Sequence, residues 1–185
     1  MKVLHLLGRS LTVAWIAAFS QLAAAQPNED PMPVMVTISE MHICCGGCVK
    51  AIQKAASIDG VQVQVLEDDE AVTLTADGYA DVQRAIDALA KAGFYGSIED
   101  DTLVGKVQFP PIRTPKDNVK KLVVRHIHNC CNGCSEAIVA AIEGVDGVSS
   151  NTVKPKAEEF IVEGNFDAGA LVAALQEAGF YPTIE

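Results

Sequence analysis

Residues 42–48 read His-Ile-Cys-Cys-Gly-Gly-Cys, and a similar heptad, His-Asn-Cys-Cys-Asn-Gly-Cys, stands 86 positions later at residues 128–134. Together the two heptads contain all six cysteines and two of the four histidines of the chain. Thiols and imidazoles are ligands that thiophilic metal ions prefer, and paired thiols also serve redox chemistry. The repetition therefore indicates either two soft-metal sites or two redox centres.

The sequence around the first heptad has the pattern of a small α+β unit. Apolar and polar residues alternate where strands are expected, and apolar residues recur three or four positions apart where helices are expected. The predicted elements are a strand from Val34, a helix from near Cys48, strands at residues 61–66 and 71–76, a helix through residues 82–89 and a strand at residues 94–98.

The second half of the chain repeats this pattern, and Ala-Gly-Phe-Tyr-x-x-Ile-Glu closes both halves, at residues 92–99 and 178–185. Such an internal repeat predicts two copies of one structural unit. We therefore predict an α+β fold of two ferredoxin-like βαββαβ sandwiches in tandem, residues 34–99 and 120–185. Residues 100–119 are the predicted linker, partly stiffened by prolines, and residues 103–109 are expected to add an edge strand.

The first 25 residues have the features of a secretory signal peptide. Lys2 and Arg9 precede an apolar run, and Ala23-Ala24-Ala25 supplies a cleavage site. The alternative is a membrane anchor, but the run is shorter than the roughly 20 apolar residues that span a bilayer. We expect a periplasmic or secreted protein that has no membrane association once the signal is removed.

The charge of the chain excludes one class of partner. The formal net charge is −10, and it becomes −12 when the signal and its two cations are removed. An acidic surface repels nucleic acid and attracts cations weakly, so we expect no nucleic-acid binding. The sequence also contains no phosphate-binding loop, Ser-His-Asp arrangement or paired carboxylates that we can place, and this argues against an enzyme.

An even number of cysteines in an exported protein permits a disulfide framework. Here, however, each trio of cysteines is packed into five residues. A disulfide within such a trio would close almost no loop and would stabilise the fold very little. The spacing therefore indicates that these cysteines are present for the chemistry of their sulfur atoms.

A βαββαβ unit with Cys-x-x-Cys between its first strand and first helix resembles the heavy-metal-associated domain. That family includes small copper chaperones, the periplasmic mercury-binding protein and the N-terminal modules of copper-pumping ATPases. The resemblance places the Cys-x-x-Cys ligands on Cys45 and Cys48 and on Cys131 and Cys134. It places the aromatic residue beneath the metal loop on Phe94 and Phe180. It implies a Cu(I) cargo and a partner protein for metal transfer.

Three departures from the family pattern change the expected ligand set. Ile43 and Asn129 stand where the family usually has Met, and His42 and His128 replace a Gly. An additional cysteine, Cys44 or Cys130, precedes each pair. Each loop thus offers three sulfurs and one imidazole, and the candidate metal ligands are His42, Cys44, Cys45, Cys48, His128, Cys130, Cys131 and Cys134. His126 and the upstream Met32, Met35 and Met41 are expected to be structural or incidental.

Chemistry favours Cu(I) as the ion, with Zn(II) or another thiophilic ion as the alternative. Three thiolates and one imidazole would complete a tetrahedral Zn(II) site. However, a segment of seven consecutive residues is short for supplying all four ligands, because structural zinc sites usually draw on two separate segments. Thiolate is the species that binds metal. We therefore expect the helix N-termini at Cys48 and Cys134 to lower the pKa of these thiols.

The leading hypothesis is an exported protein that sequesters or transfers a soft metal, with one site per repeat. The alternative is a thiol–disulfide oxidoreductase, because Cys-x-x-Cys at a helix start is also used by that class. Against it, the units are shorter than a thioredoxin domain and lack the Trp-Cys-Gly-Pro-Cys sequence. A third possibility is a pair of interaction modules whose cysteines rest as disulfides.

Overall fold

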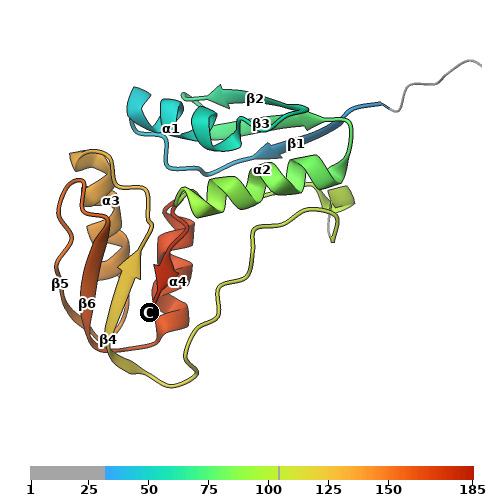
Figure 1. Ribbon diagram of the computed structural model, residues 1–185. Coiled ribbons are helices and arrows are strands. Elements are labelled where there is room, and N and C mark those ends of the chain that lie inside the picture. Colours follow the sequence, from blue (N-terminus) through green and yellow to red (C-terminus); the bar gives the residue numbers. More distant parts are fainter. Residues whose placement is uncertain (1–31, 104) are drawn as a thin grey trace, which may run out of the picture. The chain divides into compact units, whose positions relative to one another are not determined.

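The computed structural model describes residues 32–103 and 105–185, so the predicted signal peptide lies outside the described residues. Over the described residues the chain forms four α-helices and two antiparallel sheets, an α+β arrangement (Figure 1). None of these helices combines the length and the apolar character that crossing a bilayer requires.

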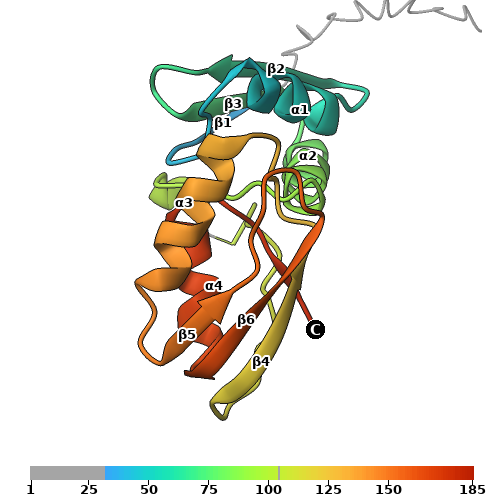
Figure 2. The same ribbon diagram turned by 90° about the vertical axis from the view of Figure 1, so that its left-hand side faces the viewer.

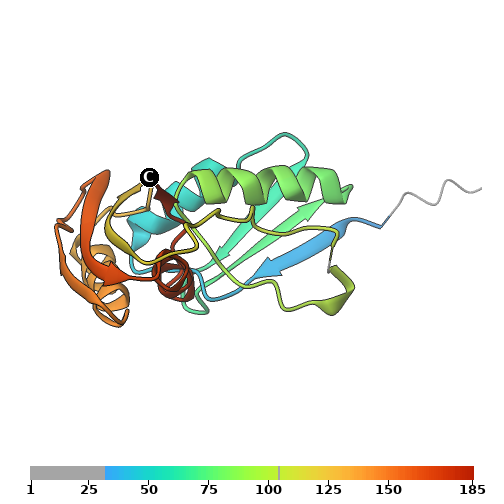
Figure 3. The same cartoon turned by 90° about the horizontal axis from the view of Figure 1, so that it is seen from below.

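The first sheet has the strand order β1-β3-β2. Val36 and Ile38 on β1 are fully buried, and they pair with Leu74 and Val72 of β3. Helices α1 and α2 contact each other and this sheet, and α2 runs along it (Figure 3). The elements are β1 (Val34–Ile38), α1 (Gly46–Ala56), β2 (Val61–Leu66), β3 (Ala71–Ala76) and α2 (Tyr79–Lys91).

The second sheet has the strand order β5-β6-β4-β7. Helices α3 and α4 contact each other beside these strands (Figure 2). The Asp167 carboxylate caps α4 by accepting a hydrogen bond from the Ala170 amide at 3.0 Å. The elements are β4 (Val119–Arg125), α3 (Asn132–Glu143), β5 (Val148–Asn151), β6 (Glu159–Phe166), α4 (Ala168–Glu177) and β7 (Thr183–Ile184).

The apolar positions that predicted the helices face the core. Ile52 on α1 and Ile86 on α2 are fully buried, as are Ile138 on α3 and Leu175 on α4. Fully burying a side chain of this size contributes about 1.5 to 3 kcal/mol relative to leaving it exposed. The spacing of these residues therefore fixes which face of each helix packs inward, and with it the direction of the loop that precedes the helix.

The predicted strand at residues 94–98 is reduced to isolated bridges. Ser97 pairs with Ser39, whereas Phe94 pairs with Phe180 in the other half of the chain. The Tyr95 amide donates to the Gly179 carbonyl at 3.0 Å. The backbone of this segment is thus divided between two partners, and it adds no continuous strand to the first sheet.

The predicted edge strand at residues 103–109 is wrong. This segment begins at the end of the short 3₁₀ helix η1 (Asp101–Leu103), and its described residues form no strand. The Gln108 amide donates to the Gln83 side chain at 2.9 Å, and the Gln83 side chain donates back to the Gln108 carbonyl at 2.8 Å. The Gln83 side chain on α2 therefore bonds the backbone amide and carbonyl of Gln108, which a neighbouring strand would otherwise have bonded.

Unusual backbone conformations recur in the two halves at the same spacing as the heptads. Three pairs of residues lie 86 positions apart and adopt positive φ angles. They are Glu40 and His126 (59° and 53°), Glu70 and Lys156 (49° and 63°), and Gly93 and Gly179 (85° and 85°). Because non-glycine residues seldom adopt such angles, the shared conformations show that the chain enters both cysteine loops in the same way.

Candidate metal centre

Each heptad forms the loop between a strand and the following helix. Cys45 and Cys131 occupy the N-cap positions of α1 and α3. Cys48 and Cys134 are the third residues of these helices and are fully buried. The first turn of each helix therefore brings the two sulfurs of its Cys-x-x-Cys pair together, at 4.0 Å in the first loop and 3.8 Å in the second.

Reciprocal backbone contacts join the segments that close the two halves, next to the cysteine loops. The Tyr95 amide donates to the Gly179 carbonyl, and the Tyr181 amide donates to the Gly93 carbonyl, both at 3.0 Å. The His128 amide also donates to the Gly93 carbonyl at 3.3 Å. The segment that closes the first half therefore binds the cysteine loop of the second half directly.

Glycine is required at the two closest points of this contact. Both Gly93 and Gly179 have a φ of +85°. A Cβ atom on Gly93 would lie 2.2 Å from the His128 backbone nitrogen, and a Cβ on Gly179 would lie 2.3 Å from that of His42. Real Cβ atoms do not approach backbone so closely. The Gly of the repeated Ala-Gly-Phe-Tyr sequence thus allows the loops to meet.

All six cysteines are free thiols, and their sulfurs form one cluster drawn from both loops. The Cys44 sulfur lies 3.5 Å from that of Cys131 and 3.6 Å from that of Cys134. The Cys48 sulfur lies 3.8 Å from that of Cys130 and 3.9 Å from that of Cys134. Several of the shortest sulfur contacts therefore cross between the two loops.

Both heptad histidines join this cluster. The imidazole of His42 packs on Phe180, with ring centroids 4.7 Å apart, and that of His128 stacks on Phe94 at 4.2 Å. In both rings Nε2 is buried and has no hydrogen-bond partner among the described residues. Three sets of ligand atoms come within 4.8 Å of one another: Cys48, His128, Cys130 and Cys134; His42, Cys44 and Cys134; and Cys44, Cys45 and Cys131.

The structure therefore places all eight candidate ligands in one region, and it places the other candidates outside it. His126 is exposed at its positive-φ position. Met41 is fully buried in the core, and Met32 and Met35 are exposed. Phe94 and Phe180 were expected beneath the metal loop of their own half. Instead, each ring packs on the histidine of the opposite half.

A buried amide that the sequence did not single out holds the second loop. The Asn129 side chain donates to the Lys154 carbonyl at 2.8 Å and accepts from the Ser135 hydroxyl at 2.7 Å. Asn129 is 7% exposed, so both bonds are shielded from water. The first loop has the buried Ile43 at the corresponding position. The two loops therefore have similar shapes but different supports.

The environment separates the pKa values of the thiols. The hydrogen bond with Cys134, and then burial, raise the pKa of Cys48, so the expected lowering at this helix N-terminus is wrong. Burial raises the pKa of Cys44 and raises that of Cys130 to about 12, since burial disfavours the charged thiolate. The backbone amide of Cys134 is the main cause that lowers the pKa of Cys131 to about 7. Burial also lowers the pKa of His42 and favours the neutral imidazole that can bind metal.

These values predict that Cys131 is the first thiol to be alkylated in the reduced, metal-free protein. Its pKa of about 7 means that its reactive thiolate forms as the pH rises through neutrality, whereas Cys130, with a pKa of about 12, stays protonated there. Timed iodoacetamide labelling with peptide mapping by mass spectrometry, from about pH 5 to about pH 9, measures both residues in one sample. Equal labelling of Cys130 and Cys131 would contradict the prediction.

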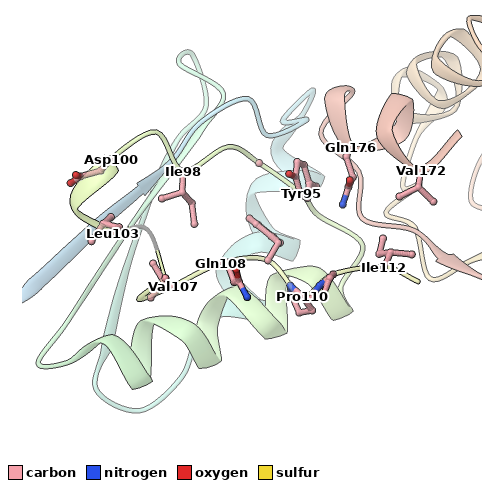
Figure 4. A pocket seen from close by; sticks show the side chains of 14 residues that line it. Tyr95, Ile98, Asp100, Leu103, Val107, Gln108, Pro110, Ile112, Val172 and Gln176 are labelled. Atoms are coloured by element: carbon pink, nitrogen blue, oxygen red, sulfur yellow. The ribbon is translucent and has the colours of Figure 1, made fainter. Parts of the chain in front are cut away.

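The surface pockets do not offer a competing site. A pocket of about 430 Å³ lies along residues 95–112, next to Val172 and Gln176 of α4 (Figure 4). Neither Cys nor His is among its described lining residues. A second pocket, of about 590 Å³, is lined by His128 and Cys130 together with Lys91, Arg125 and Lys156. This second pocket opens the edge of the cysteine cluster to solvent.

Comparison with known proteins finds a family match for part of this centre. Residues 126–181 match the model of the heavy-metal-associated domain. The matched segment contains His128 and all three cysteines of the second loop. The assignment of residues 34–99 to the same kind of domain stays a prediction.

A curated relative is "Copper-transporting ATPase 2" of Rhizobium meliloti (strain 1021). It is 26% identical in an alignment of 155 residues that covers 81% of this chain, and the chain spans 16% of the length of that relative. A similar solved structure is that of the N-terminal soluble domains of Bacillus subtilis CopA. Its identity is 16%, it covers 84% of this chain and 95% of that chain, and the TM-score is 0.31.

Proposed function

We propose that this chain is an exported soft-metal-binding protein that carries Cu(I) and sequesters it or passes it to a partner protein. In this proposal the chain consists of two ferredoxin-like units, residues 34–99 and 120–185, with the linker 100–119 between them. The observation that carries the proposal is the clustering of six free thiols with two buried imidazole nitrogens that have no hydrogen-bond partner in the described part of the chain. Such nitrogens are costly to bury unless they bind something.

Two further observations support metal as the ligand. The match to the heavy-metal-associated domain covers the second cysteine loop, and a copper-transporting ATPase is among the relatives. Soft thiolates select Cu(I), Zn(II) and other thiophilic ions over Mg²⁺ and Ca²⁺. The cluster has no carboxylate among its grouped ligand atoms. The chemistry of the described residues is therefore that of a soft-metal site.

Zn(II) remains the second candidate ion. Cys48, Cys130, Cys134 and His128 offer three thiolates and one imidazole within 4.8 Å of one another, which is a ligand set of structural zinc sites. Because these residues come from two loops, the objection that one heptad is too short does not apply to them. Cu(I) is favoured because the cluster contains six sulfurs and only two imidazoles, and thiolates are soft ligands that suit Cu(I).

Competition with a chelator tests the proposal. The reduced full chain is expected to take Cu(I) from a chelator of micromolar affinity, and a parallel titration with Zn(II) compares the two ions. His128→Asn should weaken binding about tenfold, because it removes one ligand. The matched control is His126→Asn, which should bind as the wild type does, because His126 is exposed and lies outside the cluster. Failure of the reduced chain to take up either ion would refute the proposal.

The export part of the proposal rests on residues 1–25 alone. Expression of the full sequence in a Gram-negative host, followed by fractionation and N-terminal sequencing, is expected to give a periplasmic protein that begins at Gln26. A cytoplasmic protein that keeps Met1 would contradict export and leave metal binding to be judged by the titration.

The pKa of Cys131 supports thiol–disulfide exchange as a second candidate function. A value of about 7, in a Cys-x-x-Cys pair with sulfurs 3.8 Å apart, resembles the attacking thiols of disulfide oxidoreductases. Insulin reduction at catalytic protein concentration separates the two functions. A metal carrier is expected to be inactive in this assay, and turnover that is lost in Cys131→Ser would favour the enzyme.

A further inference from the structure

We propose that the two cysteine loops build one shared Cu(I)–thiolate site for two ions, in which Cys48 or Cys134 bridges the ions, rather than one mononuclear site in each repeat. This inference rests on the proposed function, because it assumes that Cu(I) is the cargo. It names the arrangement of the ions in the site, which does not follow from a metal loop that acts alone.

The sulfur positions divide into triangular faces. A face is defined here as three sulfurs in which every pair lies no more than 4.0 Å apart. Four faces meet this definition, and each shares an edge with the next. In order they are Cys44, Cys131 and Cys134; Cys44, Cys48 and Cys134; Cys48, Cys130 and Cys134; and Cys45, Cys48 and Cys130.

The size of these faces suits one metal ion each. A metal–sulfur bond of about 2.3 Å places three sulfurs around a trigonal ion about 4.0 Å apart. The observed separations run from 3.5 Å, between Cys44 and Cys131, to 4.0 Å, between Cys45 and Cys48. An ion at the centre of a face would therefore reach all three sulfurs with small adjustments of the side chains. Every face includes sulfurs from both loops.

The imidazoles lie beside this series of faces. His128 is grouped with Cys48, Cys130 and Cys134, which form the third face, and His42 is grouped with Cys44 and Cys134, which form the edge shared by the first and second faces. The Nε2 atoms of both rings are buried and unpartnered among the described residues. An imidazole can thus add a fourth ligand to an ion in the third face or in a face that contains Cys44 and Cys134.

The sulfurs do not take part equally in this arrangement. Cys48 and Cys134 are each members of three faces, whereas Cys45 and Cys131 are each members of one. Cys48 and Cys134 are also fully buried, and their sulfurs lie 3.9 Å apart. These two residues are therefore the bridges of the cluster, although each belongs to the Cys-x-x-Cys pair of a different loop.

Loading of this site needs no redox reagent. Each thiol that becomes a ligand releases one proton to solvent, and copper enters and stays in the +1 state.

Neighbouring faces share an edge, and ions at the centres of two such faces would lie no more than about 2.3 Å apart, which is as short as a metal–sulfur bond. Two cations can therefore occupy only faces that share no edge, so the site accommodates two ions. In the proposed site they occupy the first and third faces, which share Cys134, or the second and fourth faces, which share Cys48. Mononuclear binding in each repeat also accommodates two ions, but each ion then has ligands from one loop only.

The first test uses the wild-type full chain, reduced and titrated with Cu(I) without oxygen. Copper per chain is measured after desalting against a competing chelator, and X-ray absorption is recorded on the loaded protein. The expected result is two ions per chain, together with a copper–copper scattering path of about 4 Å or less. More than two ions per chain, or no copper–copper path, would overturn the shared site while leaving the proposed function intact. Absence of any uptake would refute the proposed function itself.

The second test compares Cys45→Ser with Cys48→Ser in the full chain. Both cysteines belong to the same Cys-x-x-Cys pair, so independent sites predict equal losses, of one ion each. The shared site predicts that Cys45→Ser keeps two ions, because the first and third faces remain, whereas Cys48→Ser keeps one ion, because only the first face remains. Cys131→Ser and Cys134→Ser repeat the comparison in the second loop. Equal losses within each pair would overturn the proposal.

Because Cys48 and Cys134 belong to the hydrophobic core, the fold of each variant is measured alongside its copper content. Far-ultraviolet circular dichroism of the metal-free variants shows whether the helices remain. If a serine variant fails to fold, the wild-type stoichiometry and its copper–copper path still decide the proposal, since neither depends on a substitution.

Discussion

Gly93→Ala is expected to separate the two cysteine loops and to abolish the copper–copper path of the shared site, although it alters none of the eight candidate ligands. At a φ of +85°, alanine has an unfavourable backbone conformation that costs about 1 to 2 kcal/mol. Its Cβ would also lie 2.2 Å from the His128 nitrogen and 2.5 Å from the His126 carbonyl oxygen. Both atoms are backbone, so the clash cannot be relieved by a change of rotamer.

The matched control is Gly60→Ala. Gly60 has nearly the same φ, +83°, but a Cβ atom on it would have the Asp81 carboxylate as its nearest neighbour, at 3.9 Å, an ordinary contact. We expect Gly60→Ala to lower the free energy of unfolding by about 1 to 2 kcal/mol and to leave the copper–copper path unchanged. Gly93→Ala should cost about 4 kcal/mol or more, because a backbone clash is added to the strain.

Urea unfolding of the metal-free proteins and X-ray absorption of the copper-loaded proteins measure the two effects. Gly179→Ala should behave as Gly93→Ala does, since its Cβ would lie 2.3 Å from the His42 nitrogen. If Gly93→Ala and Gly60→Ala proved equally stable and gave the same copper–copper path, the contact between the loops would not contribute to the site.

Phe94→Ala should have the second large effect, because Phe94 is fully buried and also stacks on His128. Truncation of a buried phenylalanine leaves a cavity and costs about 3 to 5 kcal/mol. It also removes the ring that fixes the orientation of the His128 imidazole, and loss of such support weakens metal binding by about tenfold. We therefore expect a combined loss of stability and of copper affinity.

Phe166→Ala separates these two effects. Phe166 ends β6, is fully buried and belongs to the same core, but no stacking with a histidine is found for it. It should lose a similar free energy of unfolding while keeping its copper affinity. Thermal unfolding and chelator competition on both variants provide the measurements. Equal copper affinities for the two variants would show that the stacked ring does not support the site.

The sequence predicted the local structure well where a single pattern decides it. The apolar spacing of Ile52 and Ile86 defines helix faces, and the alternation of Val36 and Ile38 defines a strand, because each depends on burial of a face along one element. The strand β5 was missed, since the residues Ser149 and Ser150 at its centre are polar and give no apolar alternation. Apolar spacing indicates which residues are buried, but it does not indicate which strands pair with each other.

The eight ligand candidates were recognisable from the sequence, but their assembly into one cluster was not. Assembly depends on the carbonyls of Gly93 and Gly179, which accept hydrogen bonds from residues in the opposite half of the chain. No periodicity encodes such a contact. The nearest signal was the repeated Ala-Gly-Phe-Tyr sequence, whose glycine needs a positive φ and leaves no room for a side chain. The expectation of one site in each repeat came from treating the copies as independent.

Residues 100–119 have a consequence for how the centre responds to dilution. Because they join the two halves covalently, the encounter between the cysteine loops is intramolecular, with an effective concentration in the millimolar range for a short connection. Two separate chains would dissociate as the protein is diluted, and a site formed between them would be lost. In this chain we expect the loops to remain neighbours on dilution, so the proposed shared site would not depend on how much of the protein is present.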